Sequence, residues 1–522
     1  MSSLKKTSFI KQLNKDNRKY EIAKSIAYLQ TKVLFGEKRK QKELIYSIFE
    51  HDGFYNRNDN GLPEQYYFKP TDIIIYDLLR KEDLPKAKKG LIRLYKKCYS
   101  HKYIGSSKSE EDIERIIQGL DKTIHSGNSW YKTSHFDFTY DNELEAYIHS
   151  FEINFRNLSS SYVAIEMRIE LAEVFVNELS HFINESYEKP GMCIHQMWGR
   201  SKKKSGAKIT LGVSSGIPSE YAKNRIVYEQ FRYVKQIYMR EIVKYFPLVQ
   251  YVKDRAIGSI NIFETNVTPS KQLNKSVYAG LGLDEMEGFY FSPGERLYIS
   301  EPTFMARFSD EHDMKFVYNP ELIVDYEMYL TAHNKVLDQL TMNYMDDLYR
   351  VVILRGLGNF YSNLISDYRN KINRCKGSRR QYNSLLKLQY QINQDFYDFK
   401  KIDEELSVDV TFKNASTTLN NNEYAKASTY CGIHTCDIFI DTPKRVWKQI
   451  KLNYTEVKSD LERKLEISDS LLKYTSEKKH GWMASFQMLL AATTFFFLIF
   501  PSKAATMANW IMQLWNCIKS LI

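Results

Sequence analysis

The C-terminal segment Gly481–Phe500 constrains this chain more than any other feature, because its 20 residues include no charged side chain. A helix of that length is about 30 Å long, which matches the hydrocarbon core of a bilayer. Basic residues precede the segment (Lys478 and Lys479), and Trp482 stands near its start, where an amphipathic ring is favoured. The sequence therefore predicts a transmembrane helix, with the large N-terminal part in the cytoplasm.

The last residues, 504–522, differ in kind from this apolar run, because apolar and polar side chains alternate there at helical spacing. An amphipathic helix can lie in the plane of the membrane interface, or it can re-enter or span the bilayer with its polar face toward an aqueous pore. Both alternatives remain open at this stage. The predicted polar stripe consists of Lys503, Thr506, Asn509, Gln513 and Asn516.

A long stalk helix is predicted over residues 442–480, directly before the apolar run. Thr442 is a favoured N-cap residue, and Pro443 suits the first helical position. Apolar residues then recur with the helical period, while the remaining positions are charged. This stripe comprises Ile450, Tyr454, Val457, Leu461, Leu465 and Leu472.

The rest of the chain has the composition of a packed protein. Of its 522 residues, 43% are hydrophobic and 14% aromatic, which excludes a disordered chain. The expected fold class is α+β and mostly helical: a cytoplasmic body with a small antiparallel β element, followed by the stalk and the anchor. The predicted domains are 1–133 (basic, mostly helical), 134–319 (α+β), 320–441 (helical with a short strand), 442–480 (stalk) and 481–522 (anchor).

The β element is predicted from two alternating runs, Ser150–Asn157 and Tyr162–Leu171, which a polar turn joins. Such a pattern is typical of a β-hairpin. Two further local predictions concern single elements. Thr71–Arg80 is expected to form a helix capped by Thr71, and Asp437–Ile440 is expected to form a short strand.

The positive charge of the chain lies at its N-terminal end. Residues 1–103 contain 23 Lys and Arg against 12 Asp and Glu, whereas the remaining residues contain 51 of each. Such asymmetry indicates a surface for a polyanion, which can be acidic lipid, nucleic acid or an acidic partner. The candidate anion-binding residues lie in a basic helix near residues 85–102 and in a Gly- and Ser-rich loop: Lys86, Lys88, Lys89, Arg93, Arg200, Lys202, Lys203, Lys204 and Lys208.

Sequence support for a metal site or an enzyme is weak. Cys431, His434 and Cys436 offer three soft ligands within six residues, but zinc needs four, and the spacing matches no standard zinc motif. The chain also carries no nucleophile elbow, no His-Glu-x-x-His and no dinucleotide fingerprint. We therefore expect no cofactor and no metal, and enzymatic activity has no positive support.

The functional hypothesis at this stage is a membrane-anchored sensor–effector that perturbs or permeabilises the membrane on activation. A Lys-, Asn- and Tyr-rich composition suits an AT-rich bacterial genome, in which such proteins serve in phage defence; this link is by association. One alternative is a membrane-tethered protein that binds or processes nucleic acid. Another is a structural tether that recruits partners. Membrane lipid and a homo-oligomer or partner-protein complex are the expected associations.

Overall fold

The structure is a computed structural model, and it describes the following residues: 2–33, 35–52, 62, 64–98, 110–126, 130–133, 135–138, 141–185, 192–196, 212–215, 219–251, 258–266, 288–291, 297–301, 313–320, 348–375, 379–421, 425–426, 435–499, 509–510, 512–513 and 516. The chain divides into two compact units. The first comprises Met1–Tyr361 and Lys401–Lys448, and the second comprises Ser362–Lys400 and Gln449–Ile522.

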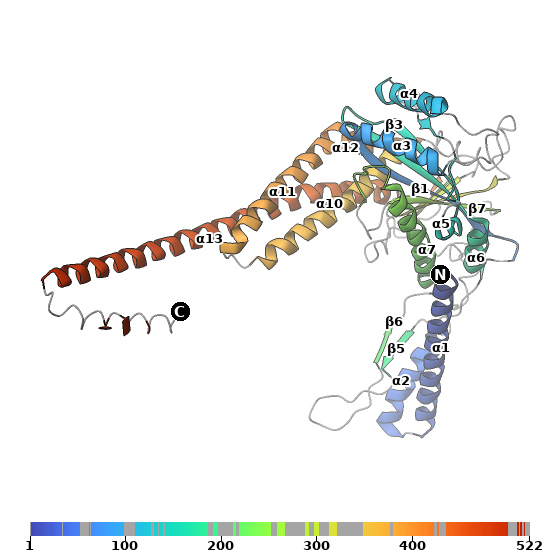
Figure 1. The fold of residues 1–522 in the computed structure, drawn as a ribbon. Helices are drawn as coiled ribbons and strands as arrows, with labels where there is room; N and C mark the ends of the chain where they lie inside the picture. The colour runs from blue at the N-terminus through green and yellow to red at the C-terminus, as the bar shows by residue number, and fades with distance from the viewer. Residues whose placement is uncertain are drawn as a thin grey trace. The chain divides into compact units, whose positions relative to one another are not determined.

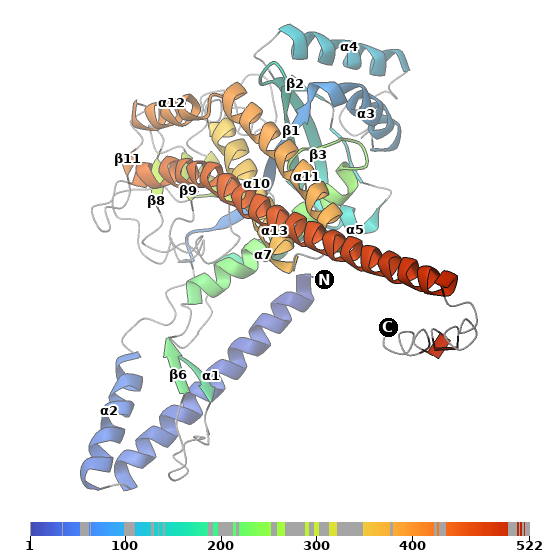
Figure 2. The ribbon, with the colours of Figure 1, turned by 90° about the vertical axis from the view of Figure 1, so that its left-hand side faces the viewer.

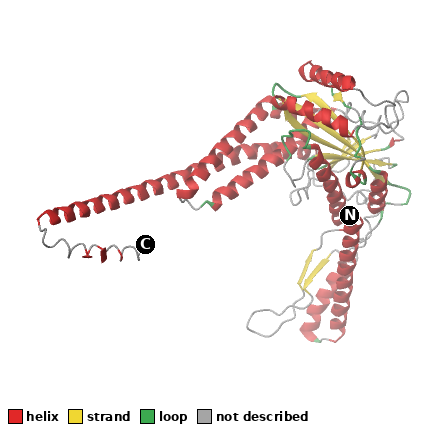
Figure 3. Ribbon diagram, in the orientation of Figure 1, coloured by secondary structure: helices red, strands yellow, loops and turns green. Residues whose placement is uncertain are grey.

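A nine-stranded sheet lies at the centre of the first unit, within the residues that the structure describes (Figures 1 and 3). Its strand order is β11-β8-β9-β10-β7-β1-β4-β3-β2. Neighbouring strands are antiparallel except β10 and β7, which run parallel. The strands are β1 Phe68–Arg80, β2 Tyr131–Lys132, β3 Ile148–Asn157, β4 Tyr162–Leu171, β7 Ser259–Thr265, β8 Gly288–Phe291, β9 Leu297–Glu301, β10 Met314–Tyr318 and β11 Ala425–Lys426.

One face of this sheet carries the main hydrophobic core. Alternate residues of the hairpin, such as Phe151 and Ile153 of β3 and Ile165 of β4, point into it and are fully buried. Helices cover this face and contribute further apolar residues: α3 Leu84–Cys98, α4 Glu110–Ser126, α5 Asn142–Glu145, α6 Glu173–Asn184 and α7 Ser219–Ile242. A short 3-10 turn, η1 Lys81–Asp83, joins β1 to α3. The predicted hairpin is confirmed, and so is the inward direction of its apolar residues.

The opposite face of the sheet packs against the first half of α10 Leu348–Arg374. Tyr349 at the start of this helix lies with its ring centroid 6.1 Å from that of Tyr76 on β1. Further along, Gly356 lies against Gly258, which directly precedes β7. Because neither glycine has a side chain, the helix backbone comes close to the strand. This face is therefore buried as well, and most polar hairpin residues on it are buried, including Asn154, Glu166 and Arg168.

The N-terminal residues form a helical hairpin, α1 Ser2–Val33 and α2 Gly36–Asp52, which stands beside the strand pair β5 Met192–Gln196 and β6 Gly212–Ser215 (Figure 2). Tyr20, Ala23, Ala27 and Thr31 of α1 are buried and recur at helical spacing. Gly36 begins α2 with a φ of 65°, a left-handed conformation that glycine adopts without strain. These two helices agree with the mostly helical character predicted for the N-terminal region.

The β3–β4 turn is attached to the end of α11 Arg379–Glu405 through one carboxylate. The hydroxyls of Ser159 and Ser161 each donate to Glu405 at 2.6 Å, and the Ser161 amide donates to it at 3.0 Å. Partial burial would raise the pKa of Glu405, but these hydrogen bonds outweigh that effect and hold its pKa below the usual value. The ionised carboxylate therefore holds the turn.

We expect Glu405→Gln to destabilise the first unit by about 1 kcal/mol at pH 7, because a neutral amide accepts these hydrogen bonds more weakly. The sign of the pH dependence follows from the lowered pKa. The stabilisation is present when the pH is above 4.5, the usual pKa of glutamate. It disappears as the pH falls through the lower pKa of Glu405 in the folded state. Urea unfolding at pH 7 and at pH 3.5 measures the difference in unfolding free energy between Glu405→Gln and the unmodified protein. An equal difference at both pH values would contradict the conclusion that an ionised Glu405 holds the turn.

The second unit is built from the distal part of α10, most of α11 and the long helix α13 Thr435–Ile499. Tyr454 of α13 packs its ring against Phe396 and Phe399 of α11. Arg369 of α10 forms an ion pair with Glu456 of α13 at 2.6 Å. Ile450, Tyr454, Val457, Leu461 and Leu465 are buried. The apolar stripe predicted for the stalk is therefore its packing face. One further helix, α12 Val408–Asn421, belongs to the first unit.

Two local predictions are wrong for identifiable reasons. Thr71–Arg80 belongs to β1 rather than to a helix, because this strand is buried on both faces and so lacks the alternation that marks a half-exposed strand. Its β-branched run, Ile73–Ile75, favours the extended form. Asp437–Ile440 lies inside α13, which begins at Thr435 and includes Pro443, so the predicted strand and the predicted cap at Thr442 both fail. The predicted β element was also too small, since it covered only part of a large mixed sheet.

The predicted transmembrane helix at Gly481–Phe500 is contradicted. Across the helices that the structure describes, none combines the length and the apolarity that a membrane crossing requires. The predicted membrane localisation is contradicted with it. The prediction rested on the absence of charge, but the run also contains polar side chains. Among them are Ser485 and Thr493, whose hydroxyls donate to helix carbonyls of the preceding turn at 2.8 Å. These residues continue α13 without a break as far as Ile499.

Candidate functional site

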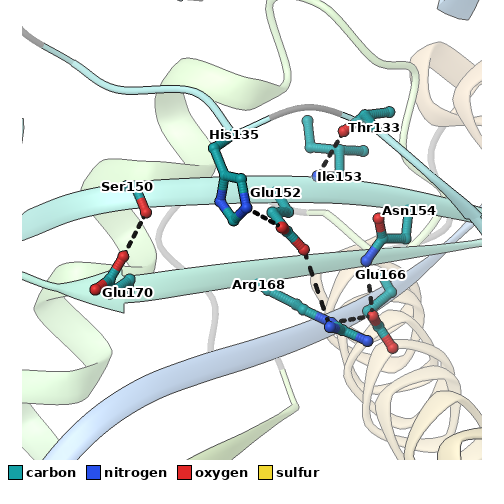
Figure 4. Close-up of polar contacts among 9 residues, drawn as sticks. All are labelled: Thr133, His135, Ser150, Glu152, Ile153, Asn154, Glu166, Arg168 and Glu170. Atoms are coloured by element: carbon teal, nitrogen blue, oxygen red, sulfur yellow. Dashed lines mark hydrogen bonds and ion pairs between the residues drawn. The ribbon is translucent and has the colours of Figure 1, made fainter. Parts of the chain in front are cut away.

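The most extensive polar network among the described residues lies on the sheet face opposite the main core, at the β2–β3–β4 end (Figure 4). Alternation places Ser150, Glu152 and Asn154 of β3 on this face. The register then sets Glu152 opposite Arg168 and Asn154 opposite Glu166 of β4. Opposite charges are therefore cross-strand neighbours, which is the arrangement that stabilises a strand pair.

The network runs from a partly exposed histidine to a buried tyrosine. His135 Nε2 lies 2.7 Å from Glu152 Oε1, and Arg168 Nη1 lies 3.9 Å from the other oxygen of Glu152. Arg168 Nε donates to Glu166 Oε1 at 2.5 Å. Glu166 also accepts from the Tyr76 hydroxyl at 2.8 Å and from Asn154 Nδ2 at 3.0 Å. Glu152 thus contacts groups that favour its ionised form, and Glu166 accepts three hydrogen bonds.

Burial increases along this network. The side chain of His135 is 25% exposed, that of Arg168 is 7% exposed and that of Glu166 is fully buried. Burial would raise the pKa of Glu152, but the hydrogen bond and charge of His135, with the charges of Arg168 and Lys132, hold it below the usual value. Burial, followed by the charge of Glu166, raises the pKa of Tyr76 well above its usual value. Glu152 is therefore an ionised carboxylate, and Tyr76 is a neutral donor.

The inner end of the network is enclosed by aromatic side chains. Tyr76, Tyr349 and Trp130 form a group in which neighbouring ring centroids are 5.2 to 6.3 Å apart. The Arg156 guanidinium lies over the rings of Trp130 and Tyr349, 5.6 and 5.1 Å from their centroids. Such cation–π contacts offset part of the cost of burying a charge. Arg156 therefore has a packing role, and His135 is the titratable group of the network that is nearest to solvent.

A second buried ion pair lies on the core side of the sheet. Lys235 of α7 donates to Asp313 at 2.5 Å and to the Ser259 hydroxyl at 3.0 Å. All three side chains are buried, and Asn261 completes the group by donating to Asp313 at 3.4 Å. Ser259 begins β7, and Asp313 directly precedes β10. This cluster therefore fixes α7 to the start of the parallel strand pair, which is a structural role.

The predicted anion-binding residues of α3 are mostly engaged. Lys86 pairs with Asp83 at 2.7 Å, Lys88 pairs with Asp121, and Arg93 donates to the Lys244 carbonyl at 3.0 Å. Lys89 is exposed. The predicted loop residues, Arg200, Lys202, Lys203, Lys204 and Lys208, lie outside the described residues. The α3 surface is therefore less available to a polyanion than its sequence suggests.

The described residues cover only part of the other predicted sites. Cys431 and His434 lie outside them, and Cys436 is described only as part of the α13 backbone. Within the described chain no group of three or more His, Cys, Asp or Glu is placed to hold a metal. Of the predicted polar stripe, Asn509, Gln513 and Asn516 are helical, and Lys503 and Thr506 lie outside the described residues. Whether the stripe forms a pore or an interface remains a prediction.

Helix α1 carries the basic surface that the charge distribution predicted. Its 32 residues include eight Lys and Arg and two acidic residues. Lys11, Lys15 and Arg18 are exposed and recur at spacings of four and three, which places them on one face of the helix. This face lies opposite the buried stripe of Tyr20 and Ala27. An α-helix turns by 100° per residue, which places the two sets about half a turn apart around the helix axis. We call Lys11, Lys15 and Arg18 the basic stripe.

Exposed aromatic side chains lie further along the same hairpin, close to the α1–α2 turn. Tyr28 is 44% exposed and Phe35 is 82% exposed. The ammonium group of Lys32 lies 5.4 Å from the centroid of the Tyr28 ring. Among the described residues none of the three basic-stripe side chains forms an ion pair with an acidic residue. The N-terminal hairpin therefore presents exposed cations along the first half of α1 and exposed rings near its turn.

Comparison with known proteins gives no assignment: the chain matches no known family, no curated protein and no solved structure at a significant level. The sequence identified the basic N-terminal region but not the His135–Glu152 network. The available signal was the set of polar residues at every second position of both hairpin strands, Glu152, Asn154, Glu166 and Arg168.

Proposed function

We propose that this protein binds single-stranded nucleic acid through α1 and the α1–α2 turn. The observation that carries the proposal is the basic stripe, three exposed cations on one face of α1, together with exposed aromatic rings further along the same helical hairpin. Proteins that bind single strands combine cations that contact the phosphates with aromatic rings on which bases stack. The membrane effector and the membrane tether considered from sequence both required the anchor, and they are not carried further.

The composition of this surface favours nucleic acid over an acidic protein partner. An acidic peptide would use the cations and would not need the exposed ring faces of Tyr28 and Phe35. A flexible single strand uses both, because every base presents a π-face at a short distance from its phosphate. The side chains of Lys11, Lys15 and Arg18 also lie along about 10 Å of helix, so that one strand can contact all three.

The test measures binding of a fluorescein-labelled oligouridylate of 20 nucleotides by anisotropy across a salt series. The triple variant Lys11→Gln, Lys15→Gln, Arg18→Gln removes three phosphate contacts. When the logarithm of its affinity is plotted against the logarithm of the salt concentration, the slope should be less steep by about 2. Its affinity should fall roughly 100-fold at 0.1 M salt. Tyr28→Ala and Phe35→Ala should weaken binding by about 1 kcal/mol or more each, without changing the slope.

The matched control is Lys458→Gln, Lys478→Gln, Lys479→Gln on α13, which removes the same charge from exposed positions of the second unit. It should retain the slope and affinity of the unmodified protein. An equal loss of affinity in both triple variants would show that net charge alone drives binding, and it would contradict the proposal. Equal affinity for a polyglutamate peptide of the same length would point to an acidic partner instead.

A further inference from the structure

The packing face of α13 continues beyond the part of the helix that the second unit covers. The buried residues on this face include Val457, Leu461 and Leu465. Trp482, Phe486 and Leu490 follow these three residues by about seven helical turns each, so they lie on the same face of the helix. Here α13 extends past the ends of α10 and α11 (Figure 1). Its packing face therefore goes on where the other described helices of the unit stop.

Five side chains on and beside this extended face are exposed, and we call them the apolar seam. The seam consists of Trp482, Met483, Phe486, Leu489 and Leu490, each between 50 and 72% exposed. Trp482, Phe486 and Leu489 follow one another at steps of four and three residues, the spacing with which helices pack side by side. The seam thus has the pattern of a helix–helix interface.

The polar residue next to the seam does not oppose its burial. Thr493 lies one turn beyond Leu489 on the same face. Its hydroxyl donates to the carbonyls of Leu489 and Leu490 at 2.8 Å, within its own helix. Covering this face would therefore leave that hydroxyl with its hydrogen bonds made, and burial would cost little.

The exposed area of the seam is close to what a stable interface needs. A large side chain presents about 150–250 Å² when fully exposed, so the seam exposes roughly 600 Å². Contiguous apolar patches above a few hundred Å² commonly mark interaction sites. Each partner in an interface of standard size contributes about 800 Å². The seam and its immediate neighbours can supply most of that area from one helix.

We propose that two copies of this chain associate through the apolar seam, as a pair of α13 helices. The residues from Gly481 to Ile499 include no charged side chain, so a partner that recognises charge finds nothing to contact. A second α13 has the same length, apolarity and spacing. Pairing one patch with the same patch of another copy also closes the interface after two chains. The inference is independent of the proposed nucleic-acid binding, because it uses no residue of α1.

The experiment measures the mass of the full chain by sedimentation equilibrium across a wide concentration series. The unmodified protein should show a reversible equilibrium between monomer and dimer. Phe486→Lys with Leu489→Lys places two charges in the seam and should raise the dissociation constant of the dimer at least about 100-fold. Both positions are exposed, and lysine is a good helix former, so circular dichroism should show an unchanged helix content.

The matched control is Met488→Lys with Phe495→Lys. These two side chains are as exposed as the seam, but they lie on the other side of the same helix, about half a turn away. The control variant should keep the dissociation constant of the unmodified protein. An equal loss of association in both variants would show that the helix associates through apolar surface in general, and it would overturn the inference.

Two further results would also overturn it. One is an unmodified chain that stays monomeric at every concentration. The other is a monomeric chain that floats with phosphatidylcholine vesicles while the seam variant does not, because that result would assign the seam to lipid rather than to a second copy. A dimer that the seam variant abolishes and the control variant retains supports the inference.

Discussion

Gly90→Ala is expected to destabilise the first unit by about 3 kcal/mol, a large part of the stability of a typical domain. Gly90 lies in α3, where it faces the backbone that follows α7. A Cβ built at this position would stand 1.8 Å from the Tyr245 carbonyl oxygen and 2.7 Å from its carbon. These are backbone atoms, so α3 and the segment after α7 would have to separate. Separation would open the core that Leu91 and Leu94 fill.

Helix propensity alone would predict the opposite change in stability. In an exposed helix, Gly→Ala stabilises by about 1 kcal/mol. Gly358→Ala in α10 is the matched control, because its Cβ would meet only Val446 Cγ1 at 3.4 Å. Urea unfolding followed by circular dichroism should show a lower midpoint for Gly90→Ala and an equal or higher midpoint for Gly358→Ala. A Gly90→Ala midpoint at or above that of the unmodified protein would contradict the close approach of α3 to Tyr245.

Asp77→Asn is expected to stabilise the protein at alkaline pH. Asp77 on β1 is fully buried, and one of its oxygens accepts the Leu78 amide at 2.6 Å and the Gln250 amide at 2.9 Å. Burial raises the pKa of Asp77 from 3.8 to about 7, and the backbone hydrogen bonds only partly oppose the rise. Asparagine keeps the accepting oxygen and carries no charge at any pH.

The pH dependence follows from the raised pKa. Between pH 3.8 and about pH 7, Asp77 keeps its proton in the folded state and loses it in the unfolded state. The free energy of unfolding therefore falls as the pH rises through this range. The advantage of Asp77→Asn should therefore grow by up to about 3 kcal/mol between pH 5 and pH 8. Asp77→Ala, which loses the acceptor, should be destabilised at both values. A constant difference between Asp77→Asn and the unmodified protein would show that Asp77 does not titrate in this range.

The sequence predicted those elements in which apolar and polar residues alternate or repeat. The strands β3 and β4 and the packing stripe of α13 show such a pattern, and all three were located correctly. The central strand β1 was missed because apolar residues stand at consecutive positions, Ile73–Ile75 and Leu78–Leu79, which removes the period on which strand prediction depends.

The candidate site was only partly predictable for a related reason. The basic region was visible because charge excess is a property of composition, and α1 bears it out. Glu152, Glu166 and Arg168 were visible only as the polar face of a hairpin. What marks them is the low exposure of their side chains and the contact of Glu152 with His135, and both depend on the packing of the folded chain.

The order of strands in the sheet has a consequence for biosynthesis. β1 lies between β4 and β7, so one of its two neighbours begins at Ser259, almost 180 residues after Arg80. At about 5–20 residues per second, a ribosome needs roughly 10–40 s to bridge that interval. During this time one edge of an apolar strand has no partner, although β3 and β4 can already pair. Nascent chains of this protein are therefore expected to need chaperone protection until β7 emerges, and truncation before Ser259 should yield aggregates.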